Sequence, residues 1–239
     1  MRLKYSLPFF VLLLCSCASL IKKNSSEQFI PAIGDLGSYS NSVLSSDFQK
    51  VGNPNLKEPI SISVTVLPFT KASFKTYTAA KERMGQKPNV VFIDSLPNKP
   101  KYLSLELSDI IGIQAALNAA DNKSVLAYLE KGEDYRLVSK IAIALDTEEA
   151  VLLSRAQRVS LIDDANGSLS LEIFTGKTKS QLNIAKLAAF DYELLGFCWG
   201  ENNYGKTRIE ALTEKGEKCP KNTERHARKL DETKDYLKL

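Results

Sequence analysis

The chain has 239 residues, with 32 Lys and Arg against 28 Asp and Glu, so its formal net charge is +4. Hydrophobic residues make up 44% and charged residues 25%, which is the composition of an ordinary globular protein. An overall excess this small is not typical of nucleic-acid-binding proteins, so no nucleic-acid partner is expected.

The first 16 residues have the layout of a secretory signal peptide. Arg2 and Lys4 are followed by an apolar run from Leu7 to Leu14 and then by small residues. The apolar run is far shorter than the roughly 20 residues needed to span a bilayer. Residues 1–16 are therefore predicted to be a removable signal peptide and not a permanent transmembrane helix.

The cleavage region reads Leu14-Cys15-Ser16-Cys17. It resembles the bacterial lipobox, with Leu three positions before the cysteine and a small residue directly before it. The resemblance implies a bacterial lipoprotein whose mature chain begins at Cys17 and carries several acyl chains there, such as palmitate, which hold it to a membrane. Cys15 fits less well because the large Leu14 precedes it. An ordinary signal peptide cleaved nearby is the alternative.

The residues after the cysteine are basic, at Lys22 and Lys23. By the same resemblance, acidic residues in this place mark surface lipoproteins in some bacteria, and an Asp directly after the cysteine marks inner-membrane retention in others. Neither feature is present. The resemblance therefore favours the outer membrane facing the periplasm, with the cell surface as the alternative.

Two cysteines remain after processing, Cys198 and Cys219. Export favours a disulfide between them, and closing a loop of about 20 residues would stabilise the fold by about 3 kcal/mol. Two buried free thiols are the alternative. His226 is the only histidine, so these residues do not supply four metal ligands, and no metal or other cofactor is expected.

The mature chain is divided by composition. Residues 17–57 are rich in Ser, Asn, Gly, Lys and Pro and are expected to form a largely irregular, lipid-anchored tether. Residues 58–221 carry the periodic apolar patterns of a globular domain. Residues 222–239 are expected to form a charged helix or tail.

Within the domain, apolar alternation predicts strands and longer amphipathic runs predict helices. Helices are expected at 71–85, 110–120, 123–132 and 148–156, with Ser108 and Asp146 in the cap positions before the second and the fourth. Strands are expected at 60–66, 89–95, 101–107, 135–145, 158–164, 168–174, 181–187, 188–200 and 206–212, with a hairpin turn at Asn166-Gly167.

This order lacks the regular alternation of strands and helices found in doubly wound folds. We therefore expect an α+β fold of one compact domain. Its sheet should be mixed and mainly antiparallel, with about four helices packed on one side.

Residues 200–207 read GENNYGKT and match the pattern of a phosphate-binding loop. Glu201 would repel phosphate, and only a short charged segment follows Thr207, so no later strand supplies a magnesium-binding acid. No nucleotide is expected, and Asn202, Asn203 and Gly205 favour a turn between two strands.

Trp199 and Tyr204 are the aromatic residues of this stretch and are a possible contact for a partner or ligand. The alternative is that Trp199 packs over the disulfide in the core.

Adjacent carboxylates occur at 133–134, 148–149 and 163–164. Neighbours on a strand point to opposite faces, so Asp163 and Asp164 should not share a site. His226, among charged neighbours, is expected on a solvated helix face. No catalytic residue is predicted.

Three functions remain open. The first is a non-catalytic accessory, scaffold or binding role of a lipid-anchored protein in a cell-envelope complex, with other envelope proteins as partners. The second is a lipid-anchored, carboxylate-dependent hydrolase acting on envelope polymers. The third is a glycan or small-ligand binder that uses the loop from Trp199 to Tyr204.

Overall fold

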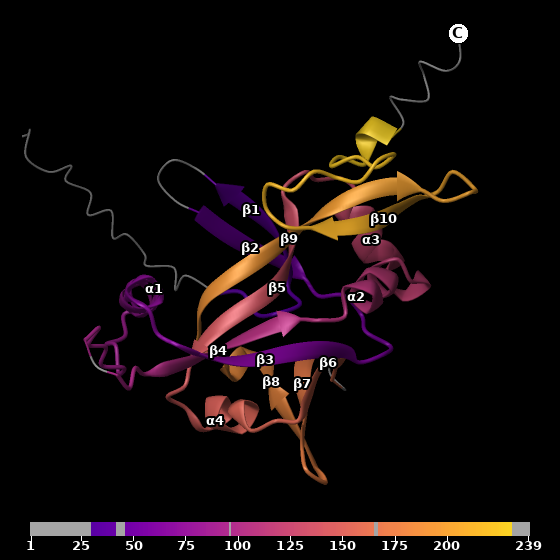
Figure 1. Ribbon diagram of the computed structural model, residues 1–239. Coiled ribbons are helices and arrows are strands. Elements are labelled where there is room, and N and C mark those ends of the chain that lie inside the picture. Colours follow the sequence, from indigo (N-terminus) through magenta and orange to yellow (C-terminus); the bar gives the residue numbers. More distant parts are fainter. Residues whose placement is uncertain (1–29, 42–45, 96, 165–166, 231–239) are drawn as a thin grey trace, which may run out of the picture.

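The computed structural model describes residues 30–41, 46–95, 97–164 and 167–230 (Figure 1). These residues form ten strands, four α-helices and two short 3-10 turns, at Ala120–Asn122 and Ile184–Lys186. The helices are α1 (Lys71–Arg83), α2 (Ile110–Leu117), α3 (Lys123–Leu129) and α4 (Glu148–Ser154). The strands are β1 (Leu36–Asn41), β2 (Ser46–Gly52), β3 (Ile60–Pro68), β4 (Lys101–Leu107), β5 (Tyr135–Ala144), β6 (Arg158–Asp163), β7 (Leu169–Thr175), β8 (Thr178–Asn183), β9 (Ala189–Glu201) and β10 (Thr207–Thr213).

The strands form one sheet in the order β10-β9-β5-β4-β3-β6-β7-β8, and β1 joins both β2 and the start of β5. All strand pairs among the described residues are antiparallel. Short turns explain part of this order, because a two-residue connection such as the one between β7 and β8 can join only antiparallel neighbours. The expected α+β fold with a mainly antiparallel sheet is confirmed.

The helices are spread around the sheet instead of covering one side (Figure 1). Helix α1 contacts β9, α2 contacts β10 and α4 contacts β3. The main core combines one face of β4, at Leu103, Leu105 and Leu107, with residues of α2 such as Ile113 and Leu117. A second, aromatic cluster lies under α1 and is built from Phe69, Tyr77, Ala80, Ala144 and Phe190.

The expected irregular tether is wrong from residue 30 onward. Residues 36–41 and 46–52 form the antiparallel strands β1 and β2, and β1 also pairs with β5. Ile33, Leu36, Phe48 and Leu56 are buried in the main core. Their apolar side chains are spaced too irregularly to show a strand period, so the turn-forming residues between them dominated the sequence pattern. Residues 17–29 lie outside the described part.

The cap residues of two helices differ from the prediction by one position, although the helices begin where they were expected. Asp109, and not Ser108, caps α2 by accepting a hydrogen bond from the backbone N–H of Gly112. Thr147, and not Asp146, caps α4. Helix α1 begins after Thr70, which forms a capping box with Ser73.

The predicted strand at 89–95 is wrong. This segment has no strand partner in the described structure, and it forms a loop over the aromatic cluster. Val90 and Phe92 pack against the cluster, whereas Val91 is 79% exposed and Ile93 is 49% exposed. The alternation of apolar side chains in this loop therefore arises from packing on α1 and not from a sheet.

The C-terminal segment is docked and not a free tail as far as residue 230. Trp199 and Glu224 exchange two backbone hydrogen bonds, with N–O distances of 2.7 and 2.8 Å. Ala227 and Leu230 pack against the main core. Residues 231–239 lie outside the described part. None of the helices in the described ranges has the length and apolar character needed to cross a membrane.

Candidate functional site

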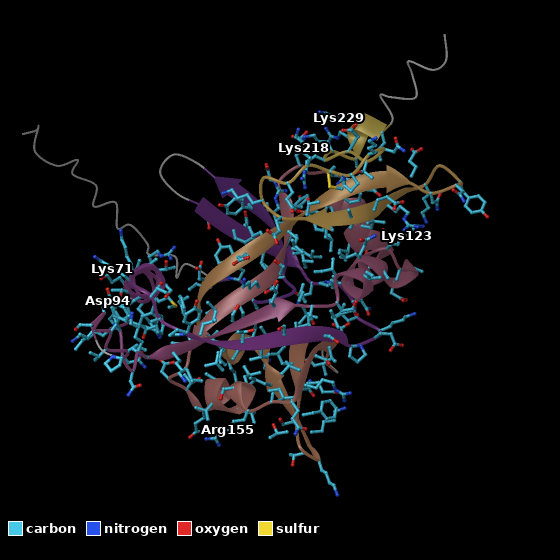
Figure 2. All side chains as sticks on the ribbon, viewed as in Figure 1. Lys71, Asp94, Lys123, Arg155, Lys218 and Lys229 are labelled. Atoms are coloured by element: carbon cyan, nitrogen blue, oxygen red, sulfur yellow. A yellow bond between two sulfur atoms is a disulfide. The ribbon has the colours of Figure 1, made fainter. Side chains whose placement is uncertain are left out.

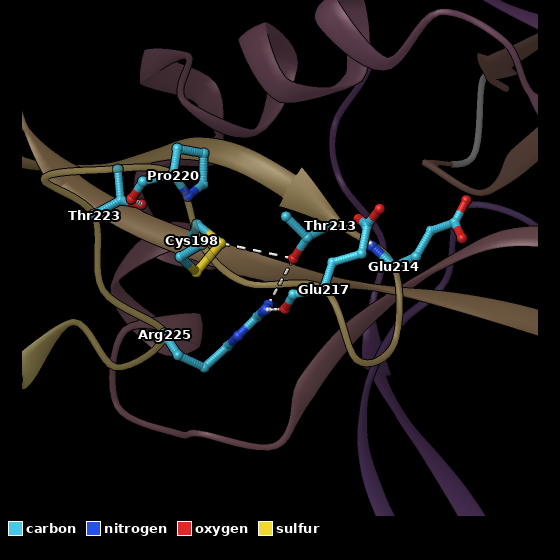
Figure 3. The surroundings of a disulfide bond; sticks show 8 residues. Cys198, Thr213, Glu214, Glu217, Pro220, Thr223 and Arg225 are labelled. Atoms are coloured by element: carbon cyan, nitrogen blue, oxygen red, sulfur yellow. Dashed lines mark hydrogen bonds between the residues drawn. A yellow bond between two sulfur atoms is a disulfide. The ribbon is translucent and has the colours of Figure 1, made fainter.

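The lipid-attachment residue inferred from the lipobox, Cys17, lies outside the described residues, as does the signal peptide of residues 1–16. The predicted disulfide is confirmed, because Cys198 of β9 and Cys219 are bonded through their sulfur atoms (Figure 3). It ties the segment after β10 to β9, the strand next to β10 in the sheet. Cys198 itself is buried.

The GENNYGKT stretch forms the end of β9, a turn and the start of β10. Asn202 Oδ1 accepts hydrogen bonds from the backbone N–H groups of Tyr204 and Lys206, both at 3.0 Å. Gly205 has φ +69°, which favours glycine. The predicted turn is confirmed. A phosphate-binding loop leads from a strand into a helix, whereas this one joins two strands.

The two aromatic residues proposed as a contact for a partner or ligand, Trp199 and Tyr204, differ in their exposure to solvent. Trp199 is 2% exposed and packs beside Phe197 in the core, so the contact role suggested for Trp199 is wrong. Tyr204 is 94% exposed at the tip of the hairpin. A binding site that uses both rings is therefore not formed.

His226 is half-buried and not on a solvated helix face, and its Nδ1 lies 3.5 Å from Glu133 Oε2. Asp163 and Asp164 are separated as expected: Asp163 accepts a hydrogen bond from the N–H of Leu56, and Asp164 caps the turn before β7. In the ranges that the structure describes, no three His, Cys, Asp or Glu side chains gather as metal ligands.

A groove of about 1060 Å³ lies along β9. Its lining includes Asp191, Glu193 and Gly196 of β9, with Arg136 of β5, and Arg225 after the disulfide. Arg83 at the end of α1 and Lys215 after β10 also border it. The groove is thus assembled from segments that lie far apart in the chain.

One edge of β9 is open along this groove. Strand β10 pairs with β9 only from Gly196 to Glu201, so residues 189–195 have no strand partner on that side in the described structure. Val138 lies opposite Leu194 but exchanges its backbone hydrogen bonds with Gly34 and Asp35 on its other side. Val138 and Leu194 thus form a non-hydrogen-bonded pair. In such an antiparallel pair, the backbone N–H and C=O groups of each residue point away from the partner strand. Leu194 therefore directs its N–H and C=O to the open edge of β9.

Asp191 partly covers this edge. Its Oδ1 accepts a hydrogen bond from the N–H of Tyr192 at 3.0 Å. Burial raises the pKa of Asp191, and the negative charge of Glu193 adds to the rise. Next to it, Lys140 is 3.1 Å from Glu193 and 3.6 Å from Glu106, so both of these acids have a cationic partner.

Two arginines meet over Gly196. A Cβ on this glycine would lie 2.6 Å from Nη1 of Arg225 and 3.8 Å from Cδ of Arg136. Glycine therefore allows both side chains to lie directly on the backbone of β9. We call this the arginine pair.

Backbone and hydroxyl oxygens hold the arginine pair in place. Arg136 Nη1 donates to the carbonyls of Glu133 at 2.9 Å and Tyr135 at 2.7 Å. Arg225 donates from Nη1 to Thr213 Oγ1 at 2.7 Å and from Nη2 to the Glu217 carbonyl at 2.8 Å (Figure 3). The disulfide thus helps to position Arg225, because Thr213, Cys198 and Cys219 lie together.

The charges of the arginine pair are not neutralised by direct ion pairs. Among the described residues, no carboxylate lies within ion-pair distance of either guanidinium. Burial lowers the pKa of Arg136, and the positive charge of Arg225 lowers it further. An anionic group placed between the two would relieve this repulsion and could accept paired hydrogen bonds.

Sequence reasoning missed this site for a physical reason. Arg136 and Arg225 are brought together only by the pairing of β5 with β9 and by the docking of residue 224 on Trp199. No local motif marks either residue. The one available signal was the disulfide, which placed the segment around Cys219 near β9.

No protein-family model, curated protein or solved structure matches the chain.

Proposed function

We propose that the protein is a lipid-anchored binding component of a bacterial cell-envelope complex, with no catalytic role. The lipobox supports the anchor at Cys17, and the basic residues that follow it favour the periplasmic face of the outer membrane. The partner is another envelope protein. Its binding site on this chain is the groove along β9.

The open edge of β9 is the observation that carries this proposal. An extended segment of a partner could add to the sheet there by bonding to the free N–H and C=O of Leu194. Main-chain bonding alone is tolerant of sequence. Selectivity would come from the arginine pair, which suits an acidic side chain or a terminal carboxylate in the added segment.

Photo-crosslinking in intact cells tests this assignment. A photoreactive amino acid at Glu214, an exposed position in the lining of the groove, should capture one envelope protein. The same amino acid at Lys177, in the exposed turn between β7 and β8, should not. Equal capture at both positions would remove the groove from consideration.

The arginine pair supplies a second arm of this experiment. We expect Arg136→Gln to reduce capture at Glu214 by at least tenfold, because a charge-assisted hydrogen bond contributes about 1.5–3 kcal/mol. Arg155→Gln is the matched control, since Arg155 is exposed at the end of α4 (Figure 2) and does not line the groove. Unchanged capture in the Arg136 variant would argue against anion recognition.

The anchor is tested separately at Cys17. A hydroxyl cannot take the thioether-linked lipid, so Cys17→Ser should leave an unacylated precursor that is not trimmed at residue 17. Mass spectrometry of the wild-type amino terminus should show acyl chains on Cys17. Normal trimming and membrane fractionation of the serine variant would contradict the lipoprotein assignment.

A carboxylate-dependent hydrolase remains the second candidate because of Asp191. A carboxyl group whose pKa is raised in a groove is a candidate general acid. Purified protein incubated with envelope polymers should then release soluble fragments, and Asp191→Asn should abolish the release without changing the midpoint of thermal unfolding. No release by the wild-type protein would eliminate this candidate.

A further inference from the structure

The basic excess of the chain is concentrated in one segment. Residues 69–101 contain seven Lys and Arg against two acidic residues, a net charge of +5. The rest of the chain, with 25 basic against 26 acidic residues, carries −1. The net charge of the whole chain, +4, does not show this local excess.

The segment folds into α1 and the loop that follows it, at one end of the molecule (Figure 1). Lys71 and Lys75 lie on one face of α1 because they are four residues apart. Both are exposed, as is Lys87. None of these three lysines has an ion-pair partner among the described residues.

Two apolar side chains project from the same loop. Val91 is 79% exposed and Ile93 is 49% exposed, while Phe92 between them packs against the aromatic cluster and fixes the loop. Asp94 is paired with Lys99 at 2.9 Å, and Lys99 also lies over the ring of Phe92. One of the two acidic residues is therefore neutralised. We call Lys71, Lys75, Lys87, Val91 and Ile93 the basic face.

The amino-terminal segment reaches the domain beside this face. Ile30, the first described residue, packs against the aromatic cluster that supports α1. Only 12 residues lie between it and Cys17, and the 13 residue steps span at most about 45 Å when fully extended. A lipid on Cys17 would keep this end of the domain near the bilayer surface.

We propose that the basic face docks on an anionic lipid bilayer, with its lysines at the lipid phosphates and Val91 and Ile93 in the headgroup region. Lysine stems and small apolar side chains suit this interface. The proposal rests on the lipid anchor of the proposed function. It adds that the domain lies on the membrane in one orientation, which leaves the disulfide end and the groove open toward a partner.

Vesicle binding by the unlipidated mature chain, residues 17–239 with Cys17→Ser, tests the face without the anchor. We expect co-sedimentation with vesicles containing phosphatidylglycerol, no binding to pure phosphatidylcholine, and weaker binding at higher salt. Lys71→Gln and Lys75→Gln should each weaken binding roughly fivefold. Val91→Ser with Ile93→Ser should weaken it at constant charge.

Lys123→Gln with Lys218→Gln is the matched control, because both lysines are exposed and lie far from Lys71 (Figure 2). Circular dichroism of each variant checks that it is folded. Absence of binding to anionic vesicles, or equal losses in the control and the basic-face variants, would overturn the proposal. Either result would leave the acylation of Cys17 untouched, since the protein tested carries no lipid.

Discussion

At the scale of single residues, two features have consequences that can be tested: the buried acidic side chain of Asp35, and Gly196, which lies under two arginines. Asp35 is 1% exposed, accepts a hydrogen bond from the N–H of Ala32 at 2.9 Å, and lies 2.7 Å from Nζ of Lys50. It holds together the turn that leads the chain into β1. Burial raises its pKa above the ordinary value of 3.8 despite the lysine.

This raised pKa predicts a defined pH dependence of stability. Just above pH 3.8 the native state retains a proton on Asp35 that the unfolded chain has released. The free energy of unfolding should therefore fall as the pH rises through that window, up to the raised native pKa. Asp35→Asn should remove this slope in urea titrations, whereas Asp94→Asn, at an exposed position, should preserve it. An identical slope in the Asp35 variant would contradict the assignment.

Gly196 makes a second prediction possible. The group that a new Cβ would meet first is the flexible end of Arg225, so Gly196→Ala should displace the guanidinium and leave the sheet intact. We expect a change of less than about 1 kcal/mol in the free energy of unfolding. Crosslinking at Glu214 should nevertheless weaken as it does in the Arg136 variant. A large loss of stability would show that the arginine pair is structural.

At the scale of elements, the edges of the sheet are treated differently. The edge of β10 is covered by α2, where Asn118 mimics a neighbouring strand: its Oδ1 accepts from the N–H of Ile209 at 2.9 Å and its Nδ2 donates to the Ile209 carbonyl at 2.8 Å. The edge of β9 beside it is left open. Natural sheets generally protect such edges, and the proposed binding role rests on this uncovered one within a groove.

Removing the side chain of Asn118 should expose the edge of β10. Asn118→Ala leaves the backbone N–H of Ile209 without its partner, at a cost of about 1–3 kcal/mol if it stays buried, and leaves the Ile209 carbonyl with the longer hydrogen bond from Gln114 Nε2, at 3.3 Å. We expect a lower melting temperature together with concentration-dependent association in sedimentation velocity. Asn122→Ala, which loses bonds to Asn55 and not to a strand edge, should lower the melting temperature without association.

The disulfide acts on one element in particular, the segment after β10. Replacing both cysteines by Ala should lower the free energy of unfolding by about 3 kcal/mol, because the bond closes a loop with a sequence separation of 21 residues. Hydrogen exchange should accelerate at the amides of Trp199 and Glu224, which bond to each other. Amides of β6 and β7 should be unaffected. Uniform acceleration would mean that the bond stabilises the whole domain and not this segment.

At the scale of the whole molecule, the domain begins earlier than its composition suggests. Segment 30–57 contributes four buried apolar side chains to the main core and pairs with β5. Gly34 lies against Leu161 and Leu169, so the same segment joins β5 to the strands at the far end of the sheet. A segment whose composition is typical of a linker thus completes the core of the domain.

Truncated chains distinguish a domain that begins at residue 30 from one that begins at residue 58. A chain starting at residue 30 should unfold cooperatively with nearly the stability of the mature chain. A chain starting at residue 58 loses four core side chains, each contributing roughly 2–3 kcal/mol, and their sum is as large as a typical domain stability. It should be unfolded by circular dichroism. A folded product would restore the tether boundary at residue 57.

The sequence by itself determined the local features whose signals are local. Strands β3, β4 and β5, the helices, the hairpin of β6 and β7 and the turn at 202–206 all followed from periodicity and turn residues, because side-chain period and backbone geometry are coupled within a few residues. The disulfide followed from counting cysteines in an exported chain. The lipid anchor and the envelope location remain predictions from the first 20 or so residues.

Only the tertiary structure decided which segments meet. It placed Ile33, Leu36, Phe48 and Leu56 in the core, moved 89–95 from a strand to a loop, buried Trp199 and brought Arg136 beside Arg225. These outcomes depend on pairings between residues far apart in the chain, whose free energy comes from burial and shared hydrogen bonds that no short window of sequence contains. The groove belongs to this second class, and so the binding role proposed for it could not be derived before the sheet was assembled.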